Sequence, residues 1–170
     1  MKALPAACAA FGILAALPAM AQSVKPICRD GSRACLIQTA ATYVAALASS
    51  DASKVPLAPN VRVTKLAKPV SQGEAQVRAY LSREAPSTGY RNARYVVDEA
   101  TGEVAAFFLL GVELKEPRAS AAEPDKLNPP GQMTIHLAER FRIEHGLITE
   151  IEAIYFSQPG TSSGDSGWPD

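Results

Sequence analysis

The sequence predicts an α+β domain in which helices pack on one face of a single curved antiparallel sheet. Two observations support this. A long helix, a short strand and a second helix precede a run of strands, an order typical of α+β domains. The last two strands alternate apolar and polar residues, as expected for a sheet that is buried on one face only.

These last two strands form a closing hairpin over residues 135–156. One face of the first strand carries four apolar residues and one acid, namely Ile135, Leu137, Glu139, Phe141 and Ile143. Residues that lie directly opposite each other on the two strands point to the same face of the sheet. A three-residue loop, 145–147, therefore gives the register in which apolar residues oppose apolar ones and arginines oppose glutamates. The predicted pairs are Phe141 with Ile151, Glu139 with Ala153, Leu137 with Tyr155, Arg142 with Glu150, and Arg140 with Glu152.

Glu139 is the main functional candidate, because it is an acid among apolar neighbours. Its predicted partner Ala153 is small, which leaves space for a ligand or a water. Two structural interpretations compete with a functional one: Glu139 is buried and paired, or a bulge turns it outward. His136 falls on the opposite face and His145 in the turn, so we expect both histidines at the surface.

The N-terminus has the pattern of a signal peptide, residues 1–21. Lys2 precedes an apolar run, 3–17, and Ala19-Met20-Ala21 predicts cleavage before Gln22. The run is too short for a convincing membrane anchor. We therefore expect an exported protein, periplasmic or secreted, with no membrane attachment after cleavage.

The remaining chain has nearly balanced charge, since removal of Lys2 leaves 16 of the 17 basic residues against 17 acidic ones. It contains no basic cluster for nucleic acid, no basic amphipathic stretch, no glycine-rich phosphate loop and no cofactor motif. We expect one domain, residues 22–156, with a small hydrophobic molecule as its partner.

Cys28 and Cys35 remain after cleavage, and an oxidising exported setting predicts a disulfide between them. Their spacing matches no zinc pattern, so no metal site is expected. The pair is also not Cys-x-x-Cys, which disfavours a redox role.

The other elements follow from local patterns. Ser32 caps a helix to about Ser49, which buries Leu36, Ala40, Tyr43 and Leu47. A strand over 61–66 precedes a helix over 73–84, with Ser71 and Glu74 as a capping box. Strands follow at 90–98 and 103–114, joined by a turn at 100–102.

Two segments have no hydrophobic period. Residues 117–131 should form a long loop that is loosely packed or acts as a lid, with Leu127 as its one apolar anchor. Residues 157–170 should be a flexible C-terminal tail. Its Trp168 either docks over an apolar opening or faces solvent or a partner.

Several motifs carry a resemblance to a known superfamily. They are Tyr43-Val44-Ala45-Ala46-Leu47, Asp51, Gly73-Glu74-Ala75, Phe141-Arg142-Ile143 and Ile148-Thr149-Glu150-Ile151. They resemble the nuclear transport factor 2-like, or SnoaL-like, superfamily over nearly all of the chain up to Phe156. The stretch 98–104 looks most like a group of exported members of unassigned function. The resemblance implies a cone-shaped sheet around a pocket.

A more distant similarity is to ketosteroid isomerase within that superfamily. By this resemblance Tyr43 falls on the oxyanion-hole tyrosine and Glu139 on the oxyanion-hole acid. Both groups can donate hydrogen bonds to an enolate. The position of the general base falls at or near Lys65. A lysine could serve as the base only if burial lowered its pKa substantially, and a solvated strand-end charge is the competing interpretation. A core tyrosine with a satisfied hydroxyl is the competing interpretation of Tyr43.

Three function classes follow. The first is a binding domain for a small hydrophobic molecule, with a pocket lined by Tyr43, Phe108, Leu110, Val112, Glu139, Phe141, Ile151 and Tyr155. The second is an isomerase, cyclase or dehydratase acting by enolisation, with Tyr43 and Glu139 as hydrogen-bond donors. The third is a homodimeric interaction module that uses the outer face carrying Ala138, Ile154 and Phe156.

Overall fold

The computed structural model describes residues 25–82, 87–119, 127–128 and 130–160. Its elements are α1 (Arg33–Ser49), β1 (Leu57–Lys65), β2 (Lys68–Gln72), α2 (Glu74–Leu81), β3 (Ser87–Asp98), β4 (Glu103–Leu114), β5 (Arg118–Ala119), β6 (Leu127–Asn128), β7 (Gly131–Glu144) and β8 (Leu147–Pro159). Among these described strands, six form one sheet in the order β2-β1-β8-β7-β4-β3, while β5 and β6 pair separately. The predicted α+β class is confirmed, although β1 and β8 are parallel.

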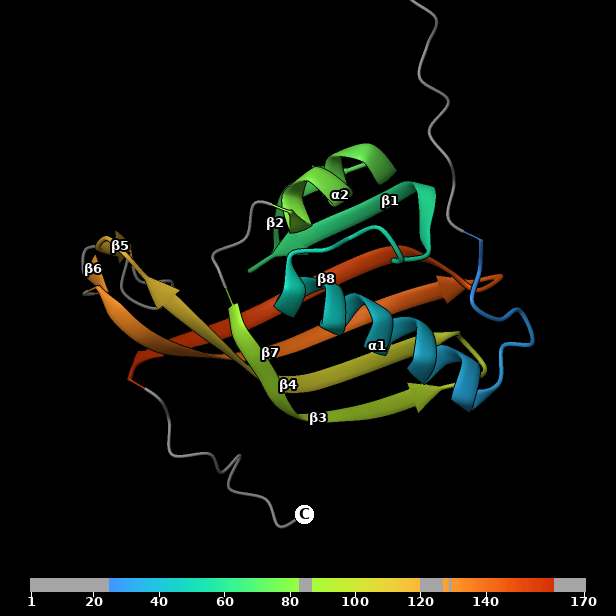
Figure 1. Ribbon diagram of the computed structural model, residues 1–170. Helices are drawn as coiled ribbons and strands as arrows, with labels where there is room; N and C mark the ends of the chain where they lie inside the picture. The colour runs from blue at the N-terminus through green and yellow to red at the C-terminus, as the bar shows by residue number, and fades with distance from the viewer. Residues whose placement is uncertain (1–24, 83–86, 120–126, 129, 161–170) are drawn as a thin grey trace, which may run out of the picture.

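The sheet curves around α1, and α2 lies beside β1 and β2 (Figure 1). We call the face toward the helices the inner face and the opposite face the outer face. The core lies between α1 and the inner face, which carries Val104, Ala106 and Phe108 on β4. These three side chains are at most 3% exposed.

Helix α1 is formed as its sequence predicts. The Ser32 side chain accepts a hydrogen bond from the Cys35 backbone N–H at 3.3 Å, which satisfies one donor of the first turn. The predicted apolar face is buried, with Tyr43 1% exposed. The helix ends at Ser50, which has a left-handed φ of 55°.

The connection between the two helices differs from the prediction. Strand β1 begins at Leu57 instead of Val61, and β2 was not predicted. Ser71 lies in β2 opposite Val63, so the predicted capping box is wrong, and Gly73 is the N-cap of α2. The turn before β2 has positive φ at Leu66 and Ala67. Such residues rarely adopt this conformation, so no local signal marked the turn.

The closing hairpin has the predicted register at all five predicted pairs. The predicted three-residue loop is wrong, because Glu144 pairs with Leu147 across a two-residue turn. His145 and Gly146 both have positive φ there, as a type I′ turn requires. A bulge at Thr149 restores the register, and its hydroxyl donates to the Arg142 carbonyl at 3.3 Å.

The predicted flexible tail begins inside a strand. β8 continues to Pro159, which pairs with Met133, because the edge of β7 still offers backbone partners there. The predicted signal peptide, most of the predicted loop (120–126 and 129) and Trp168 lie outside the described residues. Within the described loop residues, the backbone of Leu127 pairs with Ala119.

The predicted disulfide between Cys28 and Cys35 is present, with Cα atoms 5.6 Å apart. It joins the N-terminal segment to the first turn of α1. Among the described residues, no helix is both long and apolar enough to cross a membrane.

Candidate functional site

All eight predicted pocket residues lie on or against the inner face. β4 contributes three, β7 two and β8 two, while Tyr43 reaches them from α1. Seven are buried and Tyr155 is half-buried. The alternation of the strands explains this grouping, because residues of one parity in paired strands share a face.

Tyr43 and Glu139 belong to the same part of this face. The Tyr43 ring contacts the Phe141 ring edge to face, with centroids 5.1 Å apart. Phe141 is two residues from Glu139 along β7, so the three side chains follow one another on the inner face. A phenol and a carboxyl group therefore lie in one buried region, and each has an interaction within the chain.

Glu139 has an alanine beside it on each neighbouring strand. It pairs with Ala106 on β4 and with Ala153 on β8. The three residues are at most 1% exposed, which excludes a bulge that turns the acid outward. Glu139 takes part in a polar or charge interaction within the chain, so the paired-acid interpretation stands beside the functional one.

The same register extends to the next strand on each side, which is β3 beside β4 and β1 beside β8. Tyr95 on β3 pairs with Ala106, and Lys65 on β1 pairs with Ala153. We call these five residues the inner row: Tyr95, Ala106, Glu139, Ala153 and Lys65. Burial, and then the neighbouring Tyr90, raise the pKa of Tyr95, so its hydroxyl is neutral at physiological pH.

Lys65 is not the solvated strand-end charge that the sequence suggested. Its side chain is half-buried, and its Nζ atom lies 4.7 Å from the Tyr80 ring centroid and 5.6 Å from that of Tyr155. Tyr80 comes from α2, so the helix brings an aromatic face to the end of the inner row. Only the tertiary structure joins these residues, because they are far apart in the sequence.

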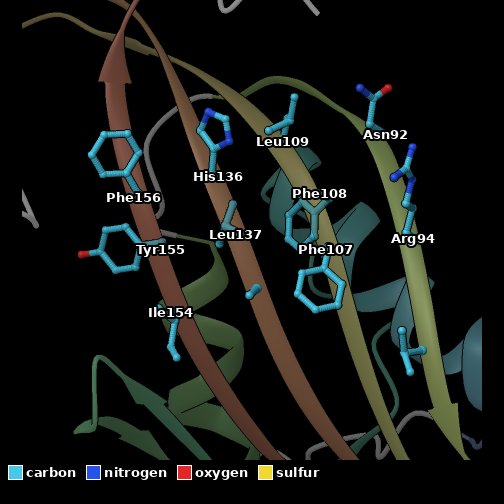
Figure 2. Close-up of a pocket in the computed structure, with 12 residues that line it drawn as sticks. Asn92, Arg94, Phe107, Phe108, Leu109, His136, Leu137, Ile154, Tyr155 and Phe156 are labelled. Carbon is cyan, nitrogen blue, oxygen red and sulfur yellow. The ribbon is translucent and has the colours of Figure 1, made fainter. Parts of the chain in front are cut away.

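A second feature is a groove of about 740 Å³ on the outer face. Figure 2 shows Ile154 and Phe156 on β8, His136 on β7 and Phe107 on β4, with the helices behind the sheet. Four hydrophobic side chains on this face are about half exposed or more: Val96, Phe107, Ile154 and Phe156. Ile154 and Phe156 were predicted on this face, but Val96 and Phe107 were not. The alternation of apolar and polar residues along β3 and β4 could have indicated them.

Among the described residues, one group of three potential metal ligands lies close together, namely Cys28, Asp30 and Cys35. The two sulfur atoms are bonded to each other. In this oxidised form the group does not offer the thiolates that bind transition metals.

Comparison with known proteins gives a family and a fold. The family described as "Domain of unknown function (DUF8021)" matches residues 29–155. No curated protein sequence matches the chain significantly.

Three solved structures illustrate the fold. A putative isomerase from Bacillus subtilis has a TM-score of 0.57 and 10% identity, covering 72% of this chain and 86% of that one. The epoxide hydrolase/cyclase-like enzyme SalBIII, with a role in pyran ring formation in salinomycin, has a TM-score of 0.57 and 14% identity, with coverage of 74% and 93%. An epoxide hydrolase from M. tuberculosis, of the LEH-like type, has a TM-score of 0.53 and 14% identity, with coverage of 72% and 83%.

At these identities the likeness establishes the fold and leaves the chemistry open. It confirms the fold that the resemblance to the nuclear transport factor 2-like, or SnoaL-like, superfamily predicted.

Proposed function

Because this chain belongs to the DUF8021 family and has a nuclear transport factor 2-like fold, we propose that it is an exported domain that binds a small hydrophobic molecule with a polar tip. The apolar part of the ligand contacts the inner face, and its tip lies at Glu139. Ligand sites commonly combine an apolar lining with a few polar groups in this way.

The observation that carries the proposal is the pair of alanines beside Glu139. Protein interiors are closely packed, so a buried acid is normally covered by the side chains of its neighbours. Ala106 and Ala153 each offer a single methyl group. Glu139 is itself 1% exposed, so a ligand that forms a hydrogen bond with it would replace side chains that now cover it.

An enzymatic role for the same residues is the second candidate. The Tyr43 ring contacts Phe141, which is two residues from Glu139 along β7, and a phenol and a protonated carboxyl group can each donate a hydrogen bond. Such a pair could stabilise an enolate during isomerisation, cyclisation or dehydration. The similarity in fold to a putative isomerase and to a cyclase-like enzyme supports this class. Full turnover of an identified substrate by Glu139→Gln would contradict it.

A homodimer is a separate proposal that is compatible with either function. The exposed apolar side chains of the outer face support it, since large exposed apolar patches commonly mark interfaces. The partner would be a second copy of the chain.

Native mass spectrometry of the protein purified from its own host tests the binding proposal. We expect a hydrophobic small molecule in stoichiometric amount and a mature N-terminus at Gln22. The variant Ala106→Leu should lose the molecule, because the larger side chain occupies the space beside Glu139. The matched control Ala105→Leu adds the same volume on the outer face and should retain it, since neighbouring strand residues point to opposite faces.

Circular dichroism should show that both variants are folded. A host-purified wild-type protein that is empty, or equal occupancy of the two folded leucine variants, would contradict the inner-face site.

A further inference from the structure

We propose that the groove on the outer face holds the C-terminal segment of the same chain, residues 161–170, and that Trp168 is the side chain that fills it. The inference concerns the opposite face of the sheet from the proposed ligand site, so neither depends on the other. It gives an occupant to an apolar surface that the described residues leave exposed.

The first argument is the size and the chemistry of the groove. Its volume of about 740 Å³ falls within the range of about 300–1,000 Å³ that is usual for sites of small organic groups, so an indole ring fits. Phe107 and Phe156 line it and are 47% and 50% exposed. The ring of Phe156 lies 6.1 Å from that of His136, centroid to centroid. Such rings offer edge-to-face and offset contacts to a further aromatic ring.

The second argument is the place where the described chain ends. Gly160 lies about 13 Å beyond Phe156 along the strand direction, at the usual rise per residue. Its N–H donates to the Gln132 carbonyl at 2.6 Å, which fixes the point of exit from the sheet. Its φ of 87° bends the chain away from the strand direction there.

Trp168 is close enough in sequence to return to the groove. The residues from Gly160 to Trp168 span at most about 27 Å when fully extended, which is about twice the distance from Gly160 back to Phe156. The segment can therefore reverse its direction and still reach the aromatic side chains of the groove.

The third argument is the composition of the segment. Apart from Trp168, residues 161–170 are Gly, Ser, Thr, Asp and Pro, so the indole is the one large apolar group that the segment can bury. A tryptophan buries about 150–250 Å² of surface. A short Gly- and Ser-rich connection also holds such a group at a high effective concentration. One side chain is then sufficient for docking within the chain.

A second copy of the chain is the competing occupant, because the homodimer proposed above uses the same exposed side chains. Attachment to the chain favours the segment in dilute solution, whereas mass action favours the second copy as the concentration rises. In the monomer Trp168 fills the groove, and formation of the dimer releases it.

Fluorescence tests the inference, because Trp168 is the only tryptophan of the chain. The reference for an exposed indole is a synthetic peptide of residues 161–170. In the purified protein, at a concentration where sedimentation shows a monomer, the emission should be shifted to the blue. Quenching by acrylamide should be severalfold weaker than in the peptide. A tryptophan as accessible as that of the peptide would overturn the inference.

Two matched variants locate the docked side chain. Phe107→Asp and Ile27→Asp each place a carboxylate at a partly exposed apolar position, but only Phe107 lines the groove. Phe107→Asp should restore most of the quenching seen in the peptide, because a docked indole would remove the water around the new charge. Ile27→Asp should keep the wild-type protection.

Circular dichroism verifies that both variants are folded, and Phe156→Asp replaces Phe107→Asp if the latter is not. Equal protection in the folded groove variant and in Ile27→Asp would place Trp168 elsewhere and overturn the inference. Protection that appears only as the dimer forms would assign the groove to the second copy, with the same consequence.

Discussion

At the residue scale, Gly146 illustrates how one position meets two separate requirements. It lies in the β7–β8 turn with a φ of +75°, which L side chains rarely adopt. A Cβ atom there would also lie 1.8 Å from the Cys28 carbonyl oxygen. The segment held by the disulfide therefore packs directly on the backbone of the turn.

Gly146→Ala should consequently destabilise the protein more than Gly31→Ala. Gly31 has a similar φ of +67°, but an added Cβ meets nothing within 4 Å. We expect Gly31→Ala to cost about 1 kcal/mol of unfolding free energy from backbone strain alone. Gly146→Ala should cost at least about 1 kcal/mol more, because the Cys28 backbone must move. Urea denaturation measures both losses, and equal losses would contradict the packing argument.

At the element scale, a charged cluster joins four strands on the outer face. Arg140 on β7 contacts Glu103 on β4 at 3.0 Å and both Glu152 and Glu150 on β8 at 3.2 Å and 3.4 Å. Arg62 on β1 also contacts Glu150. Opposite charges on neighbouring strands support the register that the apolar inner face selects.

This cluster predicts how stability depends on pH. Desolvation raises the pKa of Glu150, but the charges and hydrogen bonds of Arg62 and Arg140 outweigh it, so its pKa lies below the ordinary 4.5. A lowered pKa stabilises the folded state above the unfolded value, and this contribution is lost as the pH falls through the folded value. Arg140→Met should therefore cost about 1 kcal/mol at neutral pH, since the cluster is partly exposed.

The difference in unfolding free energy between wild type and Arg140→Met should shrink as the pH is lowered below 4.5. Chemical denaturation at several pH values measures it, with the exposed Arg33→Met as a control that shows little loss at any pH. A loss that stays constant down to the acid limit would mean that the carboxylates of the cluster are not its cause.

At the scale of the whole molecule, the two faces of the sheet have different chemistry. The inner face combines the core with the inner row. The outer face has a charged part around Arg140 and an apolar part where Ile154 is 61% and Val96 63% exposed. Three arginines of this part, Arg62, Arg140 and Arg142, balance three carboxylates that they contact, Glu103, Glu150 and Glu152. Two copies could therefore approach through this face without strong repulsion.

We expect the mature protein to be a dimer at micromolar concentration in sedimentation equilibrium. Ile154→Lys should shift it toward monomer, because a charge in the apolar interface loses its hydration. Ile27→Lys is the control, since Ile27 is 37% exposed in the N-terminal segment and lines neither the outer groove nor the charged part of the outer face. Wild-type protein that remains a monomer at high concentration would rule out the homodimer.

The sequence predicted those parts of the site that depend on alternation within one strand. Polarity matching selected the hairpin register, so Glu139 and its partner Ala153 were placed correctly. Ala106 and Lys65 were not placed beside them, because strand order across a sheet is not encoded locally. β2 was not predicted for a related reason. The turn between β1 and β2 contains no glycine that would mark it, and β2 is stabilised by pairing with β1, although its own residues have little strand propensity.

The sequence by itself thus determined the α+β class, the capped helix α1, the register of the five predicted hairpin pairs, the disulfide and the inward direction of Tyr43. Each follows from local periodicity, capping or pairing chemistry. The tertiary structure alone decided that Lys65 lies over Tyr80 and Tyr155 and that Glu139 has alanine on both sides. These features depend on which strands and helices become neighbours, and that is settled by burial of the whole inner face.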